Sequence, residues 1–414
     1  MKEKRKMKRK TIKILLAVLL CGLCLQGCTV VRMSGLSNNR KKSQTDKIPQ
    51  TTVFLSSFDK WAANAKPGLY KKNRKMYMTW DELISNGMMT VSGNELIKYQ
   101  SQLKEDNDNE NILVIDDGIT VIGDDAFSAA EEDVDWSYPF FSNQNHLRHI
   151  WLPDNIEKIG QNAFAGSKTL EEIKIPEKVK EINARTFMKC IKLEKVTFSE
   201  SLKSIDDSAF EYCETLTSIE IPDSLETLSG SAFDYSGLEE LNIKNATIVP
   251  NRTSLFSNFS CMSNLEKFTA SKGLPSNVDG ILVQCDKINE IKIPNGTKEI
   301  TDASFARNEA LQKVTLPDTL EKIGNLSFGS NISLEEINIP DSVKEIGIGA
   351  FEFCPKLNKI HYRGNTYTKE EFVKAAQEYI KIDESAFQES LSTEALARFH
   401  DAYVAKHPKE NAQN

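Results

Sequence analysis

Cysteines and histidines are the residues of this 414-residue chain with the widest chemical repertoire. Cys21 and Cys24 form a C-x-x-C pair, but they lie inside an apolar N-terminal stretch, where this spacing has no redox meaning. The chain contains no H-E-x-x-H pair, no G-x-S-x-G nucleophile motif and no phosphate-binding loop. We therefore expect no catalysis, no bound metal and no cofactor from the five histidines, which are His146, His149, His361, His400 and His407.

The cysteines after residue 28 occupy a recurring position rather than metal-binding pairs. Cys190, Cys213 and Cys354 each follow a phenylalanine by three residues. Serine or asparagine takes the same place elsewhere, at Ser167, Ser236, Asn308 and Asn331. We interpret the position as small and buried, because the C-x2-C spacing of zinc sites is absent there. The sequence leaves open whether a Cys190–Cys213 or a Cys261–Cys285 disulfide forms.

The first 27 residues have the composition of a lipoprotein signal peptide. A basic start precedes an apolar stretch over 14–25, which is too short to span a membrane. The stretch ends in Leu25-Gln26-Gly27-Cys28, which resembles a bacterial lipobox. This predicts that Cys28 is the site of lipid attachment and holds the protein on a membrane. The alternatives are an ordinary secretory signal and an uncleaved anchor.

The overall charge argues against one class of partner. The chain carries a net charge of −7, and its first 27 residues contain eight Lys/Arg and one Glu, so the remainder carries −14. Nucleic-acid binding needs a basic face for the phosphates. We therefore expect no nucleic-acid partner for the mature chain.

One pattern recurs every 23 residues and decides the expected architecture. It reads Leu-x-x-Ile-x-Ile-Pro-x-x-Val/Leu-x-x-Ile-x-x-x-Ala-Phe-x-x-Cys/Ser, and its phenylalanines are Phe164, Phe187, Phe210 and Phe233, then Phe305, Phe328 and Phe351. A fixed period of this length predicts a repeat solenoid whose apolar strands stack into a parallel β-sheet. Between the two runs, residues 245–287 leave room for two coils without the Ala-Phe signature.

The regions outside the repeats predict caps and a tether. We expect a flexible tether over 28–50, a small α/β N-terminal cap module over 51–111, the repeats over 112–362 and a helical C-terminal cap over 363–414. Capping boxes at Thr79–Glu82 and Thr368–Glu371 predict two helix starts. Residues 88–91 and 95–99 predict a hairpin, and residues 382–390 resemble the back half of a degenerate coil.

The residues that face outward from the strands can be compared from one repeat to the next, because they recur at fixed positions. The third position of each repeat alternates between Glu and Lys along most of the array. Because opposite charges on neighbouring strands attract, this pattern favours a stabilising charge ladder over a role in ligand recognition. The fifth position is mostly small or polar, except at Trp151, which shares a face with His149. These two residues are a candidate binding patch, unless the insertion 128–146 folds over them. His361 and Tyr362 are a weaker candidate at the far end.

The segment from Leu170 to Cys190 and its siblings is similar to the BspA-like leucine-rich repeat family over residues 112 to 362. The resemblance implies a right-handed leucine-rich-repeat coil and a secreted or cell-surface protein. It also implies that adhesion to matrix proteins or to other cells is one activity found among such proteins. It transfers no binding residues.

We therefore expect a bacterial cell-surface lipoprotein that binds a macromolecule for adhesion or recognition. The expected partner is a protein or glycoprotein, with host extracellular matrix among the candidates. The alternative is an envelope scaffold that binds a partner protein of the same cell.

Overall fold

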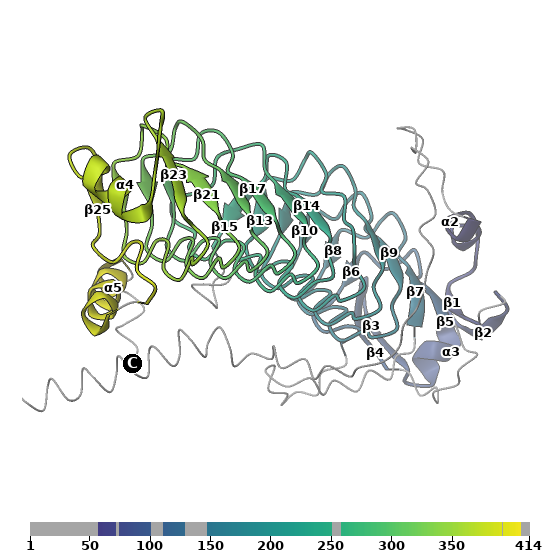
Figure 1. Cartoon of the computed structure of the whole chain (residues 1–414). Helices are drawn as coiled ribbons and strands as arrows, with labels where there is room; N and C mark the ends of the chain where they lie inside the picture. Colours follow the sequence, from purple (N-terminus) through teal and green to yellow (C-terminus); the bar gives the residue numbers. More distant parts are fainter. Residues whose placement is uncertain are drawn as a thin grey trace, which may run out of the picture.

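The repeats form one elongated solenoid with small caps at both ends (Figure 1). The computed structural model describes residues 57–71, 74–100, 111–128, 147–250, 258–390 and 392–406. The predicted signal peptide, Cys28 and the tether lie outside these residues. Within the described ranges, no helix is both long enough and apolar enough to cross a membrane.

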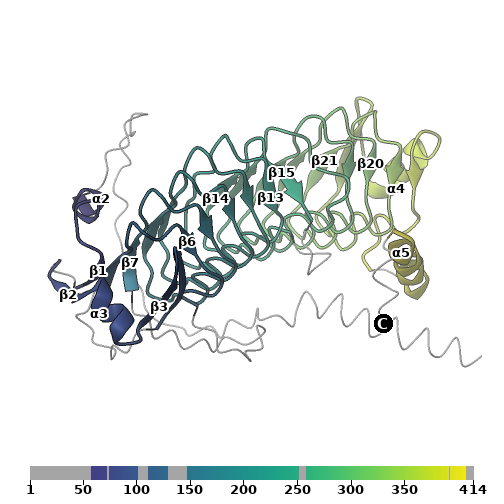
Figure 2. The ribbon, with the colours of Figure 1, turned by 180° about the vertical axis from the view of Figure 1, so that it is seen from behind.

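The regular coils contribute a longer and a shorter strand, except that the coil ending at Phe233 has only the shorter one. Strands of each kind stack in parallel on those of neighbouring coils (Figure 2). The longer strands follow the predicted Leu-x-x-Ile-x-Ile segments: β5 (Asn111–Val114), β7 (Leu147–Trp151), β9 (Glu172–Lys174), β11 (Lys195–Thr197), β14 (Glu240–Asn242), β16 (Lys267–Thr269), β17 (Glu290–Lys292), β19 (Lys313–Thr315), β21 (Glu336–Asn338) and β23 (Lys359–Tyr362). The sequence did not predict the shorter row, which is β6 (Val121–Ile122), β8 (Lys158–Ile159), β10 (Glu181–Ile182), β12 (Ser204–Ile205), β13 (Thr227–Ser229), β15 (Thr247–Val249), β18 (Glu299–Ile300), β20 (Lys322–Ile323), β22 (Glu345–Ile346) and β25 (Lys381–Ile382).

A column of phenylalanine rings runs through the interior. From Phe127 to Phe233 the ring centroids are 5.0 to 5.4 Å apart and the planes nearly parallel. A second column begins at Phe305 and ends on Phe387, with spacings of 5.1 to 5.7 Å. These rings are buried except Phe387, which packs at the end of the core. Stacked aromatic pairs contribute about 0.5–1.5 kcal/mol beyond the burial of their area, so the column holds successive coils in register.

The position three residues after each phenylalanine forms a second interior ladder. The Cys190 thiol donates to the carbonyl of Phe164 at 3.2 Å, and Cys213 repeats the bond to Phe187. The Asn331 amide makes the same contact with Phe305 at 3.0 Å. The interpretation of these cysteines as a small buried position is confirmed, because each is buried and satisfies a carbonyl of the preceding coil.

The irregular region contains two coils, as predicted. Phe259 and Leu282 take the places of the repeat phenylalanine. Phe259 lies 26 residues after Phe233, and Leu282 lies 23 residues after Phe259. The ladder of donors continues there, because the Cys285 thiol donates to the carbonyl of Phe259 at 3.4 Å. The three additional residues therefore lie between Phe233 and Phe259.

The N-terminal cap joins both rows of strands. It consists of α2 (Ser57–Ala62), β1 (Gly68–Tyr70), β2 (Met76–Thr79), α3 (Trp80–Ser85), β3 (Met89–Ser92) and β4 (Glu95–Tyr99). β1 pairs antiparallel with β5, and β4 pairs parallel with β6, so the cap covers the open end of the first coil. The predicted β3–β4 hairpin and the capping box of Thr79 and Glu82 are both confirmed.

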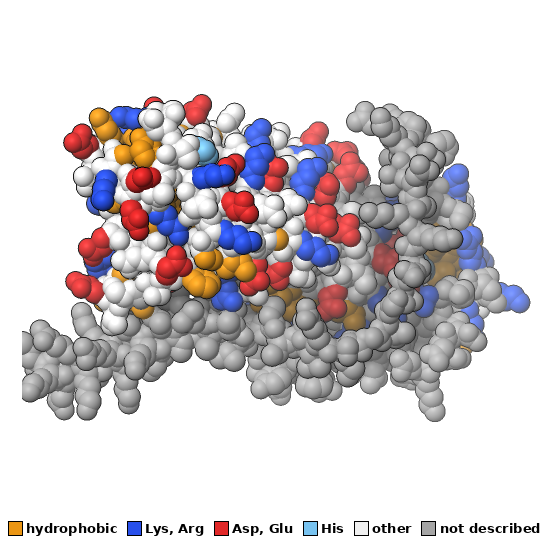
Figure 3. Space-filling model, in the orientation of Figure 1, with side chains coloured by type: hydrophobic (Ala, Val, Ile, Leu, Met, Phe, Trp, Pro, Cys, Tyr) orange, Lys and Arg blue, Asp and Glu red, His pale blue; other side chains and the backbone are white. Residues whose placement is uncertain are grey.

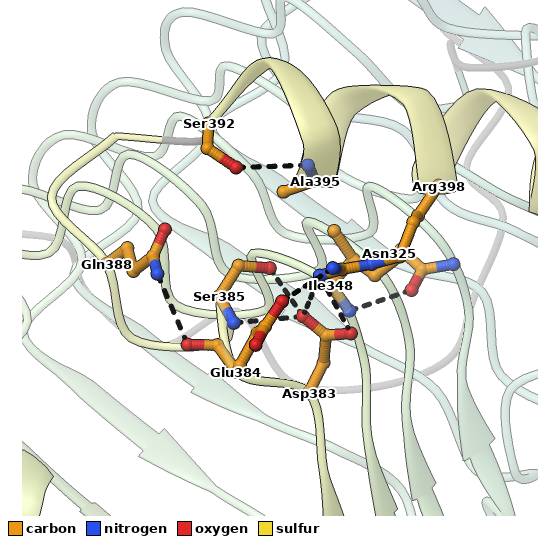
Figure 4. A network of polar contacts seen from close by, with 9 residues as sticks. All are labelled: Asn325, Ile348, Asp383, Glu384, Ser385, Gln388, Ser392, Ala395 and Arg398. Carbon is orange, nitrogen blue, oxygen red and sulfur yellow. Dashed lines mark hydrogen bonds and ion pairs between the residues drawn. The ribbon is translucent and has the colours of Figure 1, made fainter.

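The C-terminal cap closes the other end. It contains β24 (Asn365–Tyr367), α4 (Lys369–Ala376), and α5 (Thr393–Lys406), and α4 begins with the predicted capping box of Thr368 and Glu371. β25 pairs with β22, so the predicted degenerate coil is confirmed. Figure 4 shows Arg398 of α5 reaching Asp383 and Glu384 of this coil, with N···O distances of 3.0 and 2.6 Å.

Candidate functional site

The outer face of the longer strands carries a compensated charge ladder. Glu240 lies opposite Lys267, and Glu290 opposite Lys313, with N···O distances of 3.4 and 2.8 Å. At the first coils, His149 contacts Glu172 at 3.4 Å. The polar contact with His149 lowers the pKa of the Glu172 carboxyl, so this group stays ionised. Strand pairing thus places opposite charges side by side, which supports the predicted stabilising role of the third position.

Two further ladders, which the sequence did not predict, lie on the shorter-strand side. Lys322 pairs with Glu299 at 2.8 Å. Glu321 accepts from Lys298 and from Lys344 at 3.1 and 2.6 Å, and these bonds lower the pKa of its carboxyl. Over the repeats, Figure 3 accordingly shows acidic and basic side chains intermixed. At these ladder positions the opposite charges therefore largely cancel.

The fifth strand position provides a mostly uncharged strip beside the ladder, interrupted by the exposed Glu220 and Lys292. Its other middle members are small polar residues that are exposed or partly exposed: Thr197, Asn242, Thr269, Thr315 and Asn338. Short hydroxyl and amide side chains lose little conformational entropy on binding and offer both donors and acceptors. This strip is suited to hydrogen bonding with an extended partner surface.

His149 and Trp151 lie at the N-terminal end of this face, under the cap. The His149 ring lies 5.0 Å from that of Phe58 in α2. Trp151 packs, partly buried, in a small cluster with Phe58 and Trp61, and the Lys174 ammonium lies 5.8 Å from its ring centre. A long-range contact with α2 therefore covers part of the patch. The predicted cover, residues 128–146, falls outside the described residues except at its first position, Ser128.

His361 and Tyr362 lie at the other end but face opposite sides of β23. His361 is partly exposed, and its Nδ1 lies 2.8 Å from the Thr366 hydroxyl. Tyr362 is only 2% exposed and packs edge-on against Phe372. Adjacent strand residues point to opposite faces, so the two cannot form one patch. Tyr362 is a core residue, which corrects its prediction as a surface contact.

A polar hollow of about 680 Å³ opens beside His361, and the sequence did not predict it. Its lining includes Asp318, Asn338, Asp341, Ser342 and Arg363. Two carboxylates from successive coils thus share one concave site with an amide and a guanidinium. Such a site can accept from a partner's basic side chain or hydroxyls and donate to its carbonyl groups.

The hollow arises where the repeat ends. In the two preceding coils a proline follows the longer strand, at Pro317 and Pro340. Arg363 takes this place after β23, and the chain reverses into β24 through Arg363 and Gly364, both with positive φ. A two-residue hairpin of this kind needs left-handed backbone at both positions. The hairpin forms one wall, and the Pro-Asp turns form the other.

A second outward row was also missed. Two residues after the repeat phenylalanine, Tyr212 and Tyr235 stack with centroids 4.5 Å apart, and the Lys189 ammonium lies over Tyr212 at 5.7 Å. Burial raises the pKa of the Tyr235 phenol, so it stays protonated. The 23-residue period could have revealed this row, because Lys189, Tyr212 and Tyr235 share one repeat position.

Other chemistry finds little support in the described ranges. They hold no group of three His, Cys, Asp or Glu side chains placed to bind a metal ion. Cys190, Cys213, Cys261, Cys285 and Cys354 are all free thiols, so neither considered disulfide is present.

Comparison with known families gives one match. The model for the BspA type leucine-rich repeat region, with six copies, matches residues 137–263 and 257–392. No curated protein is similar enough to be matched.

Several solved structures are similar over most of the chain. A pneumococcal vaccine antigen, PcpA, is 19% identical over 80% of this chain and 90% of its own, with a TM-score of 0.37. A leucine-rich cell surface protein of Faecalibacterium prausnitzii is 18% identical over 75% of this chain and 97% of its own, with a TM-score of 0.34. A leucine-rich repeat protein of Bacteroides ovatus is 19% identical over 66% and 86%, with a TM-score of 0.29. This likeness says nothing about a ligand.

Proposed function

Since the chain belongs to the BspA type leucine-rich repeat family, we propose that it is a bacterial surface protein whose longer-strand face binds a protein or glycoprotein. The observation that carries this proposal is the polar hollow at the end of that face, beside His361. The mostly uncharged strip leads to it along the strands, so a partner can engage both. Interfaces of this kind gain their specificity from a few well-placed groups within a larger complementary surface.

The membrane is the proposed location. The lipobox-like Leu25-Gln26-Gly27-Cys28 supports acylation of Cys28, and the tether would then separate the solenoid from the bilayer. Adhesion or recognition is the proposed activity, with host extracellular matrix glycoproteins as one class of partner. A scaffold that binds an envelope protein of the same cell is the second candidate, because the same face would serve either.

Catalysis is not part of the proposal. The hollow combines Asp318 and Asp341 with an open, polar lining, and the Ser342 hydroxyl that also lines it has no hydrogen bond to a base that could activate it. An open polar site on a rigid repeat is suited to binding rather than to the exclusion of water that many reactions need.

The test uses residues 29–414, which contain every described element. The chain is applied to immobilised matrix glycoproteins and to bacterial envelope fractions. We expect saturable binding to one of them, weakened at least tenfold by Asp318→Asn combined with Asp341→Asn. Asp154→Asn with Glu177→Gln is the matched control, because these residues follow Pro153 and Pro176 in the same turn near the other end. Equal losses in both variants would contradict a site at the hollow.

The same panel separates the two candidate functions and the two ends of the face. Binding to a matrix glycoprotein supports adhesion, whereas binding only to envelope material supports the scaffold. Trp151→Ala tests the N-terminal end, where α2 covers part of the side chain, and we expect a smaller loss there than at the hollow.

A further inference from the structure

Charge is distributed very unevenly along this chain. Without the predicted signal peptide, residues 28–79 contain 11 Lys/Arg and only Asp46 and Asp59 as acidic residues, a net charge of +9. Since the chain without its first 27 residues carries −14, residues 80–414 carry −23. An asymmetry of this size indicates that the two parts face different surroundings.

The described part of this basic region forms one end of the molecule. Lys60, Lys66, Lys71, Arg74 and Lys75 are all exposed and lie on α2 or beside the β1–β2 hairpin. Both ribbon views place β2 at the extreme end, and basic side chains gather there in Figure 3. Asp59 is the one acidic residue that is described between α2 and the end of β2.

The same end exposes apolar side chains. β2 is the last strand of a six-stranded sheet, with β1 on one side. Met76 and Tyr77 on it are 38% and 43% exposed, and the Lys71 ammonium lies 5.0 Å from the centre of the Tyr77 ring. The register of β2 on β1 shifts here, because Met76 and Met78 lie opposite the adjacent residues Tyr70 and Leu69. Tyr77 is therefore the extra residue of a bulge, where the strict alternation of a strand is broken. Exposed apolar residues ringed by Lys and Arg are typical of surfaces that rest in a membrane interface, where tyrosine is enriched.

We propose that this end surface, made of Lys60, Lys66, Lys71, Arg74, Lys75, Met76 and Tyr77, docks on an anionic phospholipid membrane. The basic side chains meet the headgroup phosphates, while Met76 and Tyr77 enter the interface. A duplex nucleic acid would use the charges, but its bases are already paired and stacked, so it would leave Met76 and Tyr77 without a partner surface. In the sequence, the proposed anchor also precedes this end of the fold, because α2 is the first described element after it.

The inference deepens the proposed membrane attachment, because it adds a direct contact between the folded solenoid and the bilayer to the lipid anchor at Cys28. It orients the solenoid with its N-terminal cap on the bilayer. The hollow at the other end is then held away from the membrane, toward a partner.

The experiment uses residues 29–414, which lack Cys28, so that acylation does not contribute. The protein is sedimented with vesicles of phosphatidylcholine, with and without about one third phosphatidylglycerol. We expect binding to the anionic vesicles only, weakened by salt. Each Lys or Arg near such a surface multiplies the binding constant by about five, so Lys66→Glu, Lys71→Glu and Arg74→Glu together should lower it about a hundredfold or more.

The matched control is Lys192→Glu, Lys272→Glu and Lys356→Glu, which changes the net charge equally on exposed lysines of the repeats. We expect it to retain binding within about twofold to threefold, and Met76→Ser with Tyr77→Ser to weaken binding tenfold without changing the melting temperature. Equal binding to pure phosphatidylcholine, equal losses in both charge variants, or capture of duplex DNA in preference to the vesicles would overturn the proposal. Partner binding at the hollow would be unchanged by all these variants, so the two proposals fail separately.

Discussion

The regular coils and the two coils of the irregular region build the same solenoid from different interior residues. In the regular coils from Phe164 to Phe233, neighbouring rings stack with interplanar angles of 1° to 14°. In the irregular region Phe259 instead tilts by 40° against Phe268, and Leu282 stands where a ring would be. The ring column is therefore interrupted for two coils.

The ladder of donors behaves differently from the ring column. Cys285 donates to the carbonyl of Phe259, and the Asn308 amide donates to that of Leu282 at 2.9 Å. A backbone carbonyl in the interior needs a donor whatever the neighbouring side chain is, because leaving it unsatisfied is costly. The coil thus depends more strictly on this polar position than on the aromatic one.

The largest contrast between the two regions concerns thiol accessibility. Cys190 and Cys213 of the regular coils are fully buried, and burial raises the pKa of both thiols. Cys261 of the irregular region is partly exposed. We expect a thiol reagent at pH 8 to modify one cysteine per native molecule of residues 29–414, and five after denaturation. Mass spectrometry should identify Cys261, and rapid labelling of Cys190 would contradict the burial.

The ring column should give the largest loss of stability. Phe210→Ala removes a ring that stacks on both sides, so it should lower the free energy of unfolding by about 3–5 kcal/mol in urea titrations. Phe210→Leu should cost clearly less, because Leu282 shows that a coil can close around leucine. Phe353→Ala is the control, since this side chain is 48% exposed and its loss should change the value by no more than about 0.5 kcal/mol.

The polar ladder should give the next effect. Asn331→Ala removes the donor to Phe305 and Phe328 and the acceptor for the amide of Asn308 at 2.9 Å. Buried groups left unsatisfied should cost about 1–3 kcal/mol. Asn331→Cys should recover part of this loss, because Cys354 fills the same position one coil later with a single donor. A cysteine variant no more stable than the alanine variant would show that the donor does not matter.

The sequence predicted what repeats and missed what depends on distant contacts. Phe387 and β25 were expected as a degenerate coil because local spacing reveals them. The shorter strands were missed because a pair such as Lys158–Ile159 is too short to show alternation. The cover of Trp151 by α2 joins segments some 90 residues apart, and the hollow depends on a hairpin turn that replaces a proline. Neither feature has a periodic signal.

The charge ladder should give the smallest effect, and it separates electrostatics from packing. Lys195 lies opposite Glu172, so Lys195→Glu places two carboxylates side by side on β9 and β11. Opposed like charges on neighbouring strands should cost a few tenths to about 1 kcal/mol and lower the melting temperature at low salt. Near 1 M salt the screening length is about 3 Å, so the difference from the parent chain should vanish. Lys192→Glu is the control because it makes the same charge change in the preceding turn, outside the ladder. Two outcomes would contradict a contribution of the Glu172–Lys195 charge pair to stability: equal melting temperatures of the two variants at low salt, or a loss that persists at high salt. Backbone pairing alone would then stabilise the stack at this position.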